Sequence, residues 1–366
     1  MSTSSKSVVE SCEEVYDRAF SFLPEEFNRT VKSNGYVVID NAANFGSLSP
    51  LDHIEAVRKG YRSGIFSLYG LDEGVDESDY LSSVDRLRAG IINQSPDLLD
   101  NKLSFHQYMR NRGLEEYLPA LYGRIENGRL VSKDYDSVEE VLENRSKIVI
   151  KCVTGGGGKD VYICTMNDGR PVLFGRGDKA SHLSEKRSEL DKMIATEYCN
   201  QADYIERIYP GSANTIRVLT IHPDHGDPFI AGAAHRIGSD QSGALDNFTQ
   251  RGLSARIDPE TGKLGKAATR LETNKLRWHN SHPSTGESIK GVQIPGWKSI
   301  KDQLIEITKR TPELKYVGWD IIVTGSGVFK ILEGNSYPNP DVIQIHDPLL
   351  RDPRVRHFFR ENGINV

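Results

Sequence analysis

One segment, residues 316–340, constrains the fold more than any other part of the chain. It reads YVGWDIIVTGSGVFKILEGNSYPNP, in which two apolar runs flank the turn Gly325-Ser326-Gly327. Such a turn between apolar runs predicts an antiparallel hairpin. A loop of two or four residues would place Asp320 opposite or diagonal to Glu333, with their Cβ atoms roughly 5–8 Å apart. A three-residue loop without a bulge would separate them.

Asp320, Glu333 and Asn335 then form a set of oxygen ligands on one face, because Glu333 and Asn335 are two residues apart on a strand. Two carboxylates and an amide oxygen suit Mg²⁺ that is shared with substrate phosphates, and they do not suit zinc. The alternative is that both carboxylates lie on a solvated face of the hairpin. Trp319 and Ile331 argue against it, since they indicate a buried hairpin, and a buried carboxylate needs a partner or an ion.

A second signal is Lys151, at the end of the apolar run 147–151. Gly155, Gly156, Gly157 and Gly158 follow it and precede a second predicted strand, 161–165. Glycines let backbone N–H groups approach phosphate oxygens, and a neighbouring lysine adds positive charge. The pattern predicts a phosphate cradle on a long hairpin, although it is not a Walker A motif. A glycine hairpin without function is the alternative.

A different nucleotide-binding pattern also occurs. Gly175, Gly177 and Ala180 match G-x-G-x-x-A after the short strand 172–174, and Glu197 follows at the dinucleotide-binding distance. Asp178 would occupy the place of the pyrophosphate, and no further β-α-β unit follows. This interpretation is therefore the weaker one.

The rest of the chain reads as runs of strands with interspersed helices, which favours α+β lobes with antiparallel sheets. A strand is expected over 36–39 and helices over 102–113 and 182–194. Further strands are expected at 216–221, 229–236, 317–324 and 328–333. We divide the chain into an N-terminal lobe (1–100), a subdomain with the glycine loop (101–200) and a subdomain with the metal and substrate site (201–366).

Composition excludes several classes of function. The chain has 366 residues, an apolar fraction of 37% and a net charge of −5. Without a basic block, no nucleic-acid partner is expected. No apolar run reaches the ~20 residues of a membrane span, and the first ten residues, MSTSSKSVVE, do not resemble a secretion signal. The four cysteines form no CxxC pair, so a reducing cytoplasm is expected.

Several motifs occur in an order that resembles the ATP-grasp superfamily, and in particular the sugar-transfer associated ATP-grasp family. The likeness covers about residues 101–344 and rests on Asn101-Lys102-Leu103-Ser104-Phe105, Lys151 with its glycine loop, Ser212-Ala213-Asn214-Thr215-Ile216-Arg217, Asp246-Asn247-Phe248, His282-Pro283 with Thr285-Gly286, Gly318-Trp319-Asp320 and Glu333-Gly334-Asn335. Aspartate followed 13 residues later by Glu-x-Asn is the magnesium signature of the superfamily. The fold implied is two α+β lobes that hold ATP between antiparallel sheets, with an additional N-terminal lobe.

The resemblance also implies roles for individual residues. Lys102 and Lys151 would contact ATP phosphates, with the glycines 155–158 closing over them. A hinge of Glu197, Tyr198 and Cys199 would hold adenine. Lys151 and Arg217 would be catalytic, and the substrate side would be formed by Asn214, Arg217, Arg236 and Asn247.

The sequence departs from the family at two places. Gln250-Arg251-Gly252 stands where the family commonly has paired glycines, which affects the shape of the substrate loop. Cys199 and Asn200 are unusual in the hinge, although backbone contacts to adenine would tolerate them.

The reaction implied by the resemblance is ligation of a small-molecule carboxylate to an amine, with ATP and Mg²⁺ as cofactors, through an acyl phosphate. A small-molecule kinase and a non-catalytic ATP-binding accessory protein are the alternatives. The complete set of Asp320, Glu333 and Asn335 argues against the accessory protein. The family's link to sugar transfer suggests polysaccharide or secondary-metabolite biosynthesis. The sequence names neither substrate and leaves the oligomeric state open.

Overall fold

The structure is a computed structural model that describes residues 25–155, 160–175, 180–186, 189–243 and 246–366. The chain divides into two compact units. The first unit contains Met1–Gln94, Arg270–Arg277 and Asn339–Val366, and the second contains Ser95–Thr269 and Trp278–Pro338. The last segment of the chain therefore belongs with the N-terminal residues.

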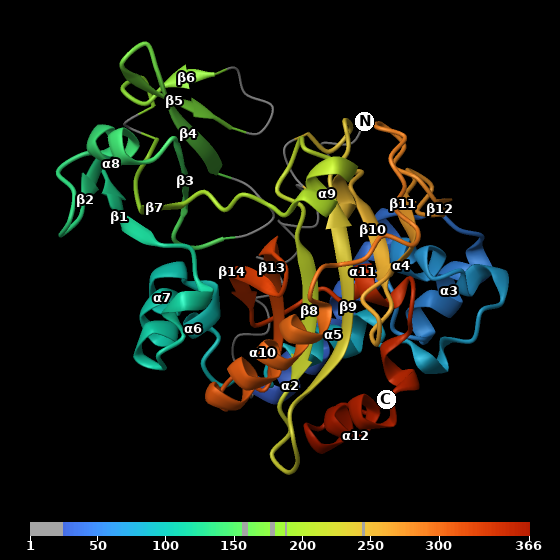
Figure 1. Ribbon diagram of the computed structural model, residues 1–366. Coiled ribbons are helices and arrows are strands. Elements are labelled where there is room, and N and C mark those ends of the chain that lie inside the picture. Colours follow the sequence, from blue (N-terminus) through green and yellow to red (C-terminus); the bar gives the residue numbers. More distant parts are fainter. Residues whose placement is uncertain (1–24, 156–159, 176–179, 187–188, 244–245) are drawn as a thin grey trace. The chain divides into compact units, whose positions relative to one another are not determined.

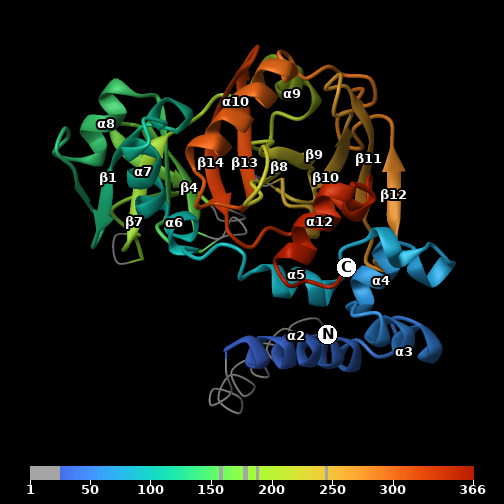
Figure 2. The same cartoon turned by 90° about the horizontal axis from the view of Figure 1, so that it is seen from below.

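The first unit is helical. Its elements are α2 (Glu25–Ala43), α3 (Pro50–Arg58), α4 (Ser63–Leu68), η1 (Leu71–Glu73), η2 (Glu77–Asp79), α5 (Ser83–Ala89), α11 (Asp341–Gln344), η5 (Leu349–Arg351) and α12 (Pro353–Glu361). In Figure 2, α2 to α5 are blue to cyan and α12 is red. Buried hydrogen bonds hold the returning segment: Tyr69 donates to Asp341 at 2.7 Å, and the Leu81 N–H donates to Gln344 at 2.8 Å.

The strand predicted over 36–39 is wrong, because these residues lie within helix α2. The buried positions are Ser33, Val37, Asp40 and Asn41, which recur every three to four residues as on one face of a helix. The side chain of Asn41 donates to the Val37 carbonyl at 2.9 Å and to the Tyr61 carbonyl at 2.9 Å. Tertiary packing of this face therefore overrides the strand preference of the β-branched pair Val37-Val38.

The first sheet of the second unit has the strand order β2-β1-β7-β3-β4-β5-β6, and its pairings are antiparallel. The strands are β1 (Leu121–Glu126), β2 (Arg129–Val131), β3 (Lys147–Cys152), β4 (Val161–Asn167), β5 (Arg170–Phe174), β6 (Ser181–His182) and β7 (Met193–Glu197). Helix α8 (Val138–Asn144) packs against this sheet. Helices α6 (Asp97–Asp100) and α7 (Lys102–Asn111) and the short turn η3 (Glu115–Tyr117) pack instead with the apolar cluster of the second sheet (Figure 1). The hairpin predicted around the glycine run is confirmed as β3–β4.

The helix predicted over 182–194 is wrong, since β6 ends at His182 and β7 begins at Met193. Met193, Ile194 and Ala195 are fully buried in the middle of the sheet, where β7 pairs with β1 and β3. The dinucleotide-binding alternative is also wrong, because β5 pairs antiparallel with β4 and β6 and not as part of a parallel sheet.

The second sheet has the order β12-β11-β10-β9-β8-β13-β14, antiparallel from β11 to β14. Its strands are β8 (Ile216–Ile221), β9 (Phe229–Ile237), β10 (Leu253–Ile257), β11 (Leu264–Arg270), β12 (Leu276–His279), β13 (Tyr316–Gly325) and β14 (Val328–Asn335). Helices α9 (Asp203–Ile208) and α10 (Trp297–Arg310) and the turn η4 (Phe248–Gln250) complete the unit. The four strands predicted between 216 and 333 are confirmed as β8, β9, β13 and β14.

Helix α10 shows how this sheet gains its core. Its buried residues Trp297, Ile300, Leu304 and Ile307 recur at three- and four-residue intervals and belong to the apolar cluster that includes Val218, on β8. Each fully buried aliphatic side chain of this kind contributes about 1.5–3 kcal/mol to the stability of the fold.

The two sheets and their helices confirm the predicted class, α+β with two antiparallel sheets. Among the described residues, no helix has the length and apolar character needed to cross a bilayer.

Candidate active site

The hairpin β13–β14 brings the two expected metal ligands together. Asp320 and Glu333 are direct cross-strand partners, and Gly325 pairs with Val328 around a two-residue turn. The register shifts twice between these pairs, so that Leu332 is an extra residue on β14 and Thr324 is an extra residue on β13. One bulge on each strand restores the original register. A bulge interrupts the alternation of side chains along a strand. For this reason the adjacent residues Leu332 and Glu333 both line the same cavity.

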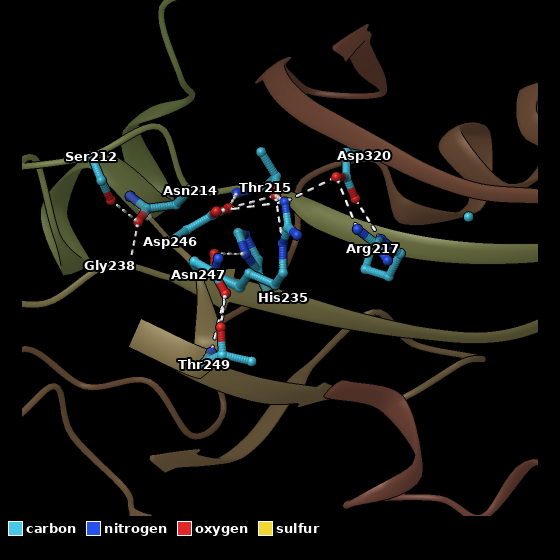
Figure 3. Close-up of polar contacts among 12 residues, drawn as sticks. Ser212, Asn214, Thr215, Arg217, His235, Gly238, Asp246, Asn247, Thr249 and Asp320 are labelled. Carbon is cyan, nitrogen blue, oxygen red and sulfur yellow. Dashed lines mark hydrogen bonds and ion pairs between the residues drawn. The ribbon is translucent and has the colours of Figure 1, made fainter. Parts of the chain in front are cut away.

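Two arginines hold Asp320 from the neighbouring strands. Arg217, its partner on β8, donates to Oδ1 at 2.6 Å through Nε and to Oδ2 at 3.0 Å through Nη2 (Figure 3). Arg236, on β9, lies 3.1 Å from Oδ2. The carboxylate is only 2% exposed. The sheet therefore fixes one buried carboxylate with a bidentate contact and a second cation.

The pKa values of the two carboxyls move in opposite directions. Burial raises the pKa of Asp320, but the charges of Arg217 and Arg236 outweigh it and hold that pKa well below its usual range. Burial and the negative charge of Asp320 raise the pKa of Glu333, which Lys102 and Lys151 offset only in part. A cation placed between the two carboxyls would relieve this repulsion, so the donor set fits Mg²⁺.

Asn335 completes the expected set. Its amide nitrogen donates to the Gly318 carbonyl at 3.0 Å, which leaves the amide oxygen as the atom that could ligate a cation. Among the residues that the structure describes, no group of three or more His, Cys, Asp or Glu side chains gathers to hold a metal. A magnesium ion here would therefore take two carboxylates from the protein and further oxygens from a phosphate.

Two lysines lie beside this hairpin, Lys151 near the end of β3 and Lys102 at the start of α7. Lys151 donates to the Leu332 carbonyl at 3.1 Å, and Lys102 donates to the Gly155 carbonyl at 2.9 Å with its ammonium 4.0 Å from Glu333. Burial lowers the pKa of Lys151 to about 8, although the charge of Glu333 raises it. This position of two ammonium groups beside a glycine turn suits polyphosphate oxygens.

A cavity of about 310 Å³ joins these groups. It is lined by ten of the residues predicted from the sequence: Lys102, Lys151, Gly155, Glu197, Tyr198, Cys199, Arg236, Asn247, Asp320 and Glu333. Residues that were not predicted line the rest: the apolar Val149, Val161, Ile163, Phe174, Ile322 and Leu332, and polar residues that include Ser212, Thr215 and Asp246. Strand pairing could have identified four of the apolar residues. Val149 is two residues from Lys151 on the same strand and pairs with Ile163, and Ile163 pairs with Phe174. Lys151 itself pairs with Val161.

The predicted hinge follows β7 at the apolar end of the cavity. Glu197 ends β7, where its N–H donates to the Ala120 carbonyl at 2.8 Å and its carboxylate accepts from the Ala120 N–H at 3.1 Å. The ammonium of Lys147 lies 4.2 Å above the ring of Tyr198. Burial raises the pKa of Cys199 to about 12, so its thiol stays protonated at neutral pH. The Tyr198 ring and the protonated thiol of Cys199, with Val149 and Ile163, give this part of the cavity the apolar surface that a base ring contacts.

Three predicted residues do not line the cavity. Arg217 and Asn335 lie behind it on β8 and β14, in the contacts given above. Asn214 is 1% exposed, and its amide bonds to Ser212 at 2.8 Å, the Gly238 N–H at 2.9 Å and the Tyr209 carbonyl at 2.6 Å (Figure 3). Its side chain thus fixes the loop that carries Ser212, and its contact with substrate stays a prediction. The predicted residues Gly156, Gly157 and Gly158 lie outside the described residues.

Two antiparallel sheets, one with Lys151 and the other with the paired carboxylates, and a cavity lined by both are the architecture of an ATP-grasp protein. Consistently, the model of the sugar-transfer associated ATP-grasp family matches residues 92–356. The chain belongs to this family. The comparison with curated proteins found no match.

Solved structures with a similar fold include D-alanine–D-alanine ligase from Bacillus anthracis, at 15% identity and a TM-score of 0.36 over 73% of this chain and 69% of that one. Biotin carboxylase from Campylobacter jejuni matches at 12% identity and a TM-score of 0.38, over 75% and 47%. N5-carboxyaminoimidazole ribonucleotide synthetase in complex with ADP matches at 13% identity and a TM-score of 0.35, over 66% and 46%. This chain thus spans less than half of that synthetase.

Proposed function

We propose that this protein is an ATP-dependent, ADP-forming ligase that activates the carboxylate of a small molecule for attack by an amine. The observation that carries the proposal is the pairing of Asp320 with Glu333 on one cavity wall, opposite the ammonium groups of Lys102 and Lys151. Membership of the ATP-grasp family supports it. The description of that family suggests a role in polysaccharide or secondary-metabolite biosynthesis.

ATP and Mg²⁺ are the proposed cofactors. Asp320, Glu333 and Asn335 would hold the metal, which supplies charge neutralisation and alignment of the phosphates. The chain of Glu197, Tyr198 and Cys199, with Val149 and Ile163, would hold adenine. Lys102 and Lys151 would bind the phosphates.

Transfer of a phosphoryl group to a carboxylate depends on position and charge more than on a covalent nucleophile. Arg236 lies next to Asp320 on the cavity wall and can hold the carboxylate in line with the phosphate. Arg217 keeps Asp320 ionised and in place. The acyl phosphate formed is then attacked by the amine, with release of phosphate.

The test measures which products ATP consumption yields. With Mg²⁺, a carboxylate and hydroxylamine in place of the amine, we expect ADP, free phosphate and a hydroxamate. A small-molecule kinase would instead accumulate a phosphorylated product that survives hydroxylamine. Release of AMP and pyrophosphate would point to an adenylate, and either result would overturn the ligase assignment.

A further inference from the structure

Beyond Asp320, the cavity wall carries a partly buried cation and a buried anion side by side. Arg236, on β9, and Asp246, just before η4, both line the cavity. Arg236 Nη2 lies 3.5 Å from Asp246 Oδ1 and 3.1 Å from Asp320 Oδ2. The pair therefore lies next to the expected metal site, on the wall of the same cavity.

Thr215 fixes both groups from the protein side, and Figure 3 shows its bonds to Asp246. Its N–H and hydroxyl donate to Asp246 Oδ2 at 2.8 and 2.5 Å, and its Oγ1 accepts from Arg236 Nε at 3.0 Å and Nη2 at 2.6 Å. Within the described part of the chain, Asp246 Oδ1 contacts only Arg236, and Arg236 Nη1 has no hydrogen-bond partner. One acceptor and one donor are thus left for a ligand.

The charge of Asp246 is incompletely compensated. Burial raises the pKa of this carboxyl more than Arg236 and the bonds from Thr215 lower it. Arg236 divides its charge between Asp246 and Asp320. A positive group on a ligand would therefore be stabilised beside Asp246, at the same place where Arg236 offers an N–H to a negative group.

We infer that the carboxylate activated by this site belongs to an α-amino acid, with its carboxylate held by Arg236 and its ammonium held by Asp246. This rests on the proposed ligase function and names its acyl donor. In an α-amino acid the two charged groups are attached to the same carbon, which matches opposite charges 3.5 Å apart on the wall. A sugar acid or an α-hydroxy acid offers no cation to Asp246.

One carboxylate oxygen attacks the γ-phosphorus of ATP, and the bond from that phosphorus to ADP breaks. The amine of the second substrate then forms a bond to the carbonyl carbon, phosphate leaves, and the amine gives up one proton to water. The ammonium held by Asp246 takes no part in these bonds.

The first experiment uses the wild-type protein with Mg²⁺, ATP and hydroxylamine. Each common α-amino acid is compared with its α-hydroxy and unsubstituted analogues, and with glucuronate as a sugar acid. We expect hydroxamate with at least one amino acid and at least tenfold less with its α-hydroxy analogue. Hydroxamate from the other acids but from no amino acid would overturn the inference and leave the ligase function standing. No hydroxamate from any acid would overturn the ligase function and the inference with it.

The second experiment assigns the ammonium site. Asp246→Asn keeps an oxygen for Thr215 but removes the charge, so we expect KM for the amino acid to rise at least tenfold while KM for ATP changes less than threefold. The preference over the α-hydroxy analogue should also be lost. Asp240→Asn is the matched control, because Asp240 is exposed and does not line the cavity. An unchanged preference in a folded Asp246→Asn protein would refute the anchor, and the wild-type comparison remains decisive if that variant does not fold.

Discussion

The ammonium of Lys151 donates to the carbonyl of Leu332 at 3.1 Å, and this bond joins the end of strand β3 to the bulge of strand β14. A nucleotide phosphate would offer this buried ammonium a stronger acceptor than a neutral carbonyl. We expect Lys151→Ala to raise the Kd for ATP at least tenfold, because a charge-assisted contact is worth about 1.5–3 kcal/mol. Isothermal titration calorimetry measures the change, and Lys133→Ala serves as the control, because Lys133 is exposed and does not line the cavity. Unchanged ATP affinity would make Lys151 a structural residue.

The pKa of Lys151, about 8, predicts how ATP binding depends on pH. Below pH 8 the side chain of Lys151 is mostly protonated before ATP binds, so it already carries the positive charge that attracts phosphate. Above pH 8 Lys151 must take up a proton when ATP binds. If the bound form stays protonated, the Kd for ATP should rise about tenfold between pH 7 and pH 9. The Kd of Lys151→Met should change less over the same range. Equal pH profiles for the two proteins would show that another group titrates.

The pairing of Asp320 with Glu333 predicts that loss of either charge stops turnover. We expect Asp320→Asn and Glu333→Gln to lower kcat at least a hundredfold, since the phosphates would lose part of their neutralising ion. Asp320→Asn should also lower the free energy of unfolding, because it leaves Arg217 without its buried counter-charge. Activity and urea unfolding are measured together. Activity within threefold of wild type in either variant would contradict the metal assignment.

Arg251 has a backbone φ of 72°, in the left-handed region that favours glycine. This conformation destabilises the folded state by roughly 1–2 kcal/mol for a residue with a side chain. Glycine avoids that strain, but its greater backbone freedom stabilises the unfolded chain and offsets part of the gain. We expect Arg251→Gly to be about 0.5–1 kcal/mol more stable than Arg251→Ala, which removes the same side chain. Urea denaturation compares the two. Equal stabilities would show that the loop relaxes.

The features predicted from sequence are those set by local pattern. The register of β13–β14 follows from one turn, and the β3–β4 hairpin follows from two apolar runs around glycines. The strand expected at 36–39 failed because the burial of Val37 and Asn41 on one helical face depends on distant residues such as Tyr61. The pairing of Arg236 with Asp246 could not be predicted either, since a loop brings Asp246 back to β8 and β9. For the same reason no local signal placed residues 339–366 with the N-terminal helices.

The two bulges at Thr324 and Leu332 also limit which insertions and deletions the β13–β14 hairpin can accept. Deletion of one of these residues alone would shift the hairpin by one position and turn Glu333 away from Asp320, because successive side chains point to opposite faces. Deletion of both would restore the pairing of Asp320 with its carboxylate partner. Between Asp320 and Glu333, insertions and deletions should therefore be tolerated only in pairs that cancel each other. The number of residues between the two carboxylates is thus fixed by the register of the hairpin.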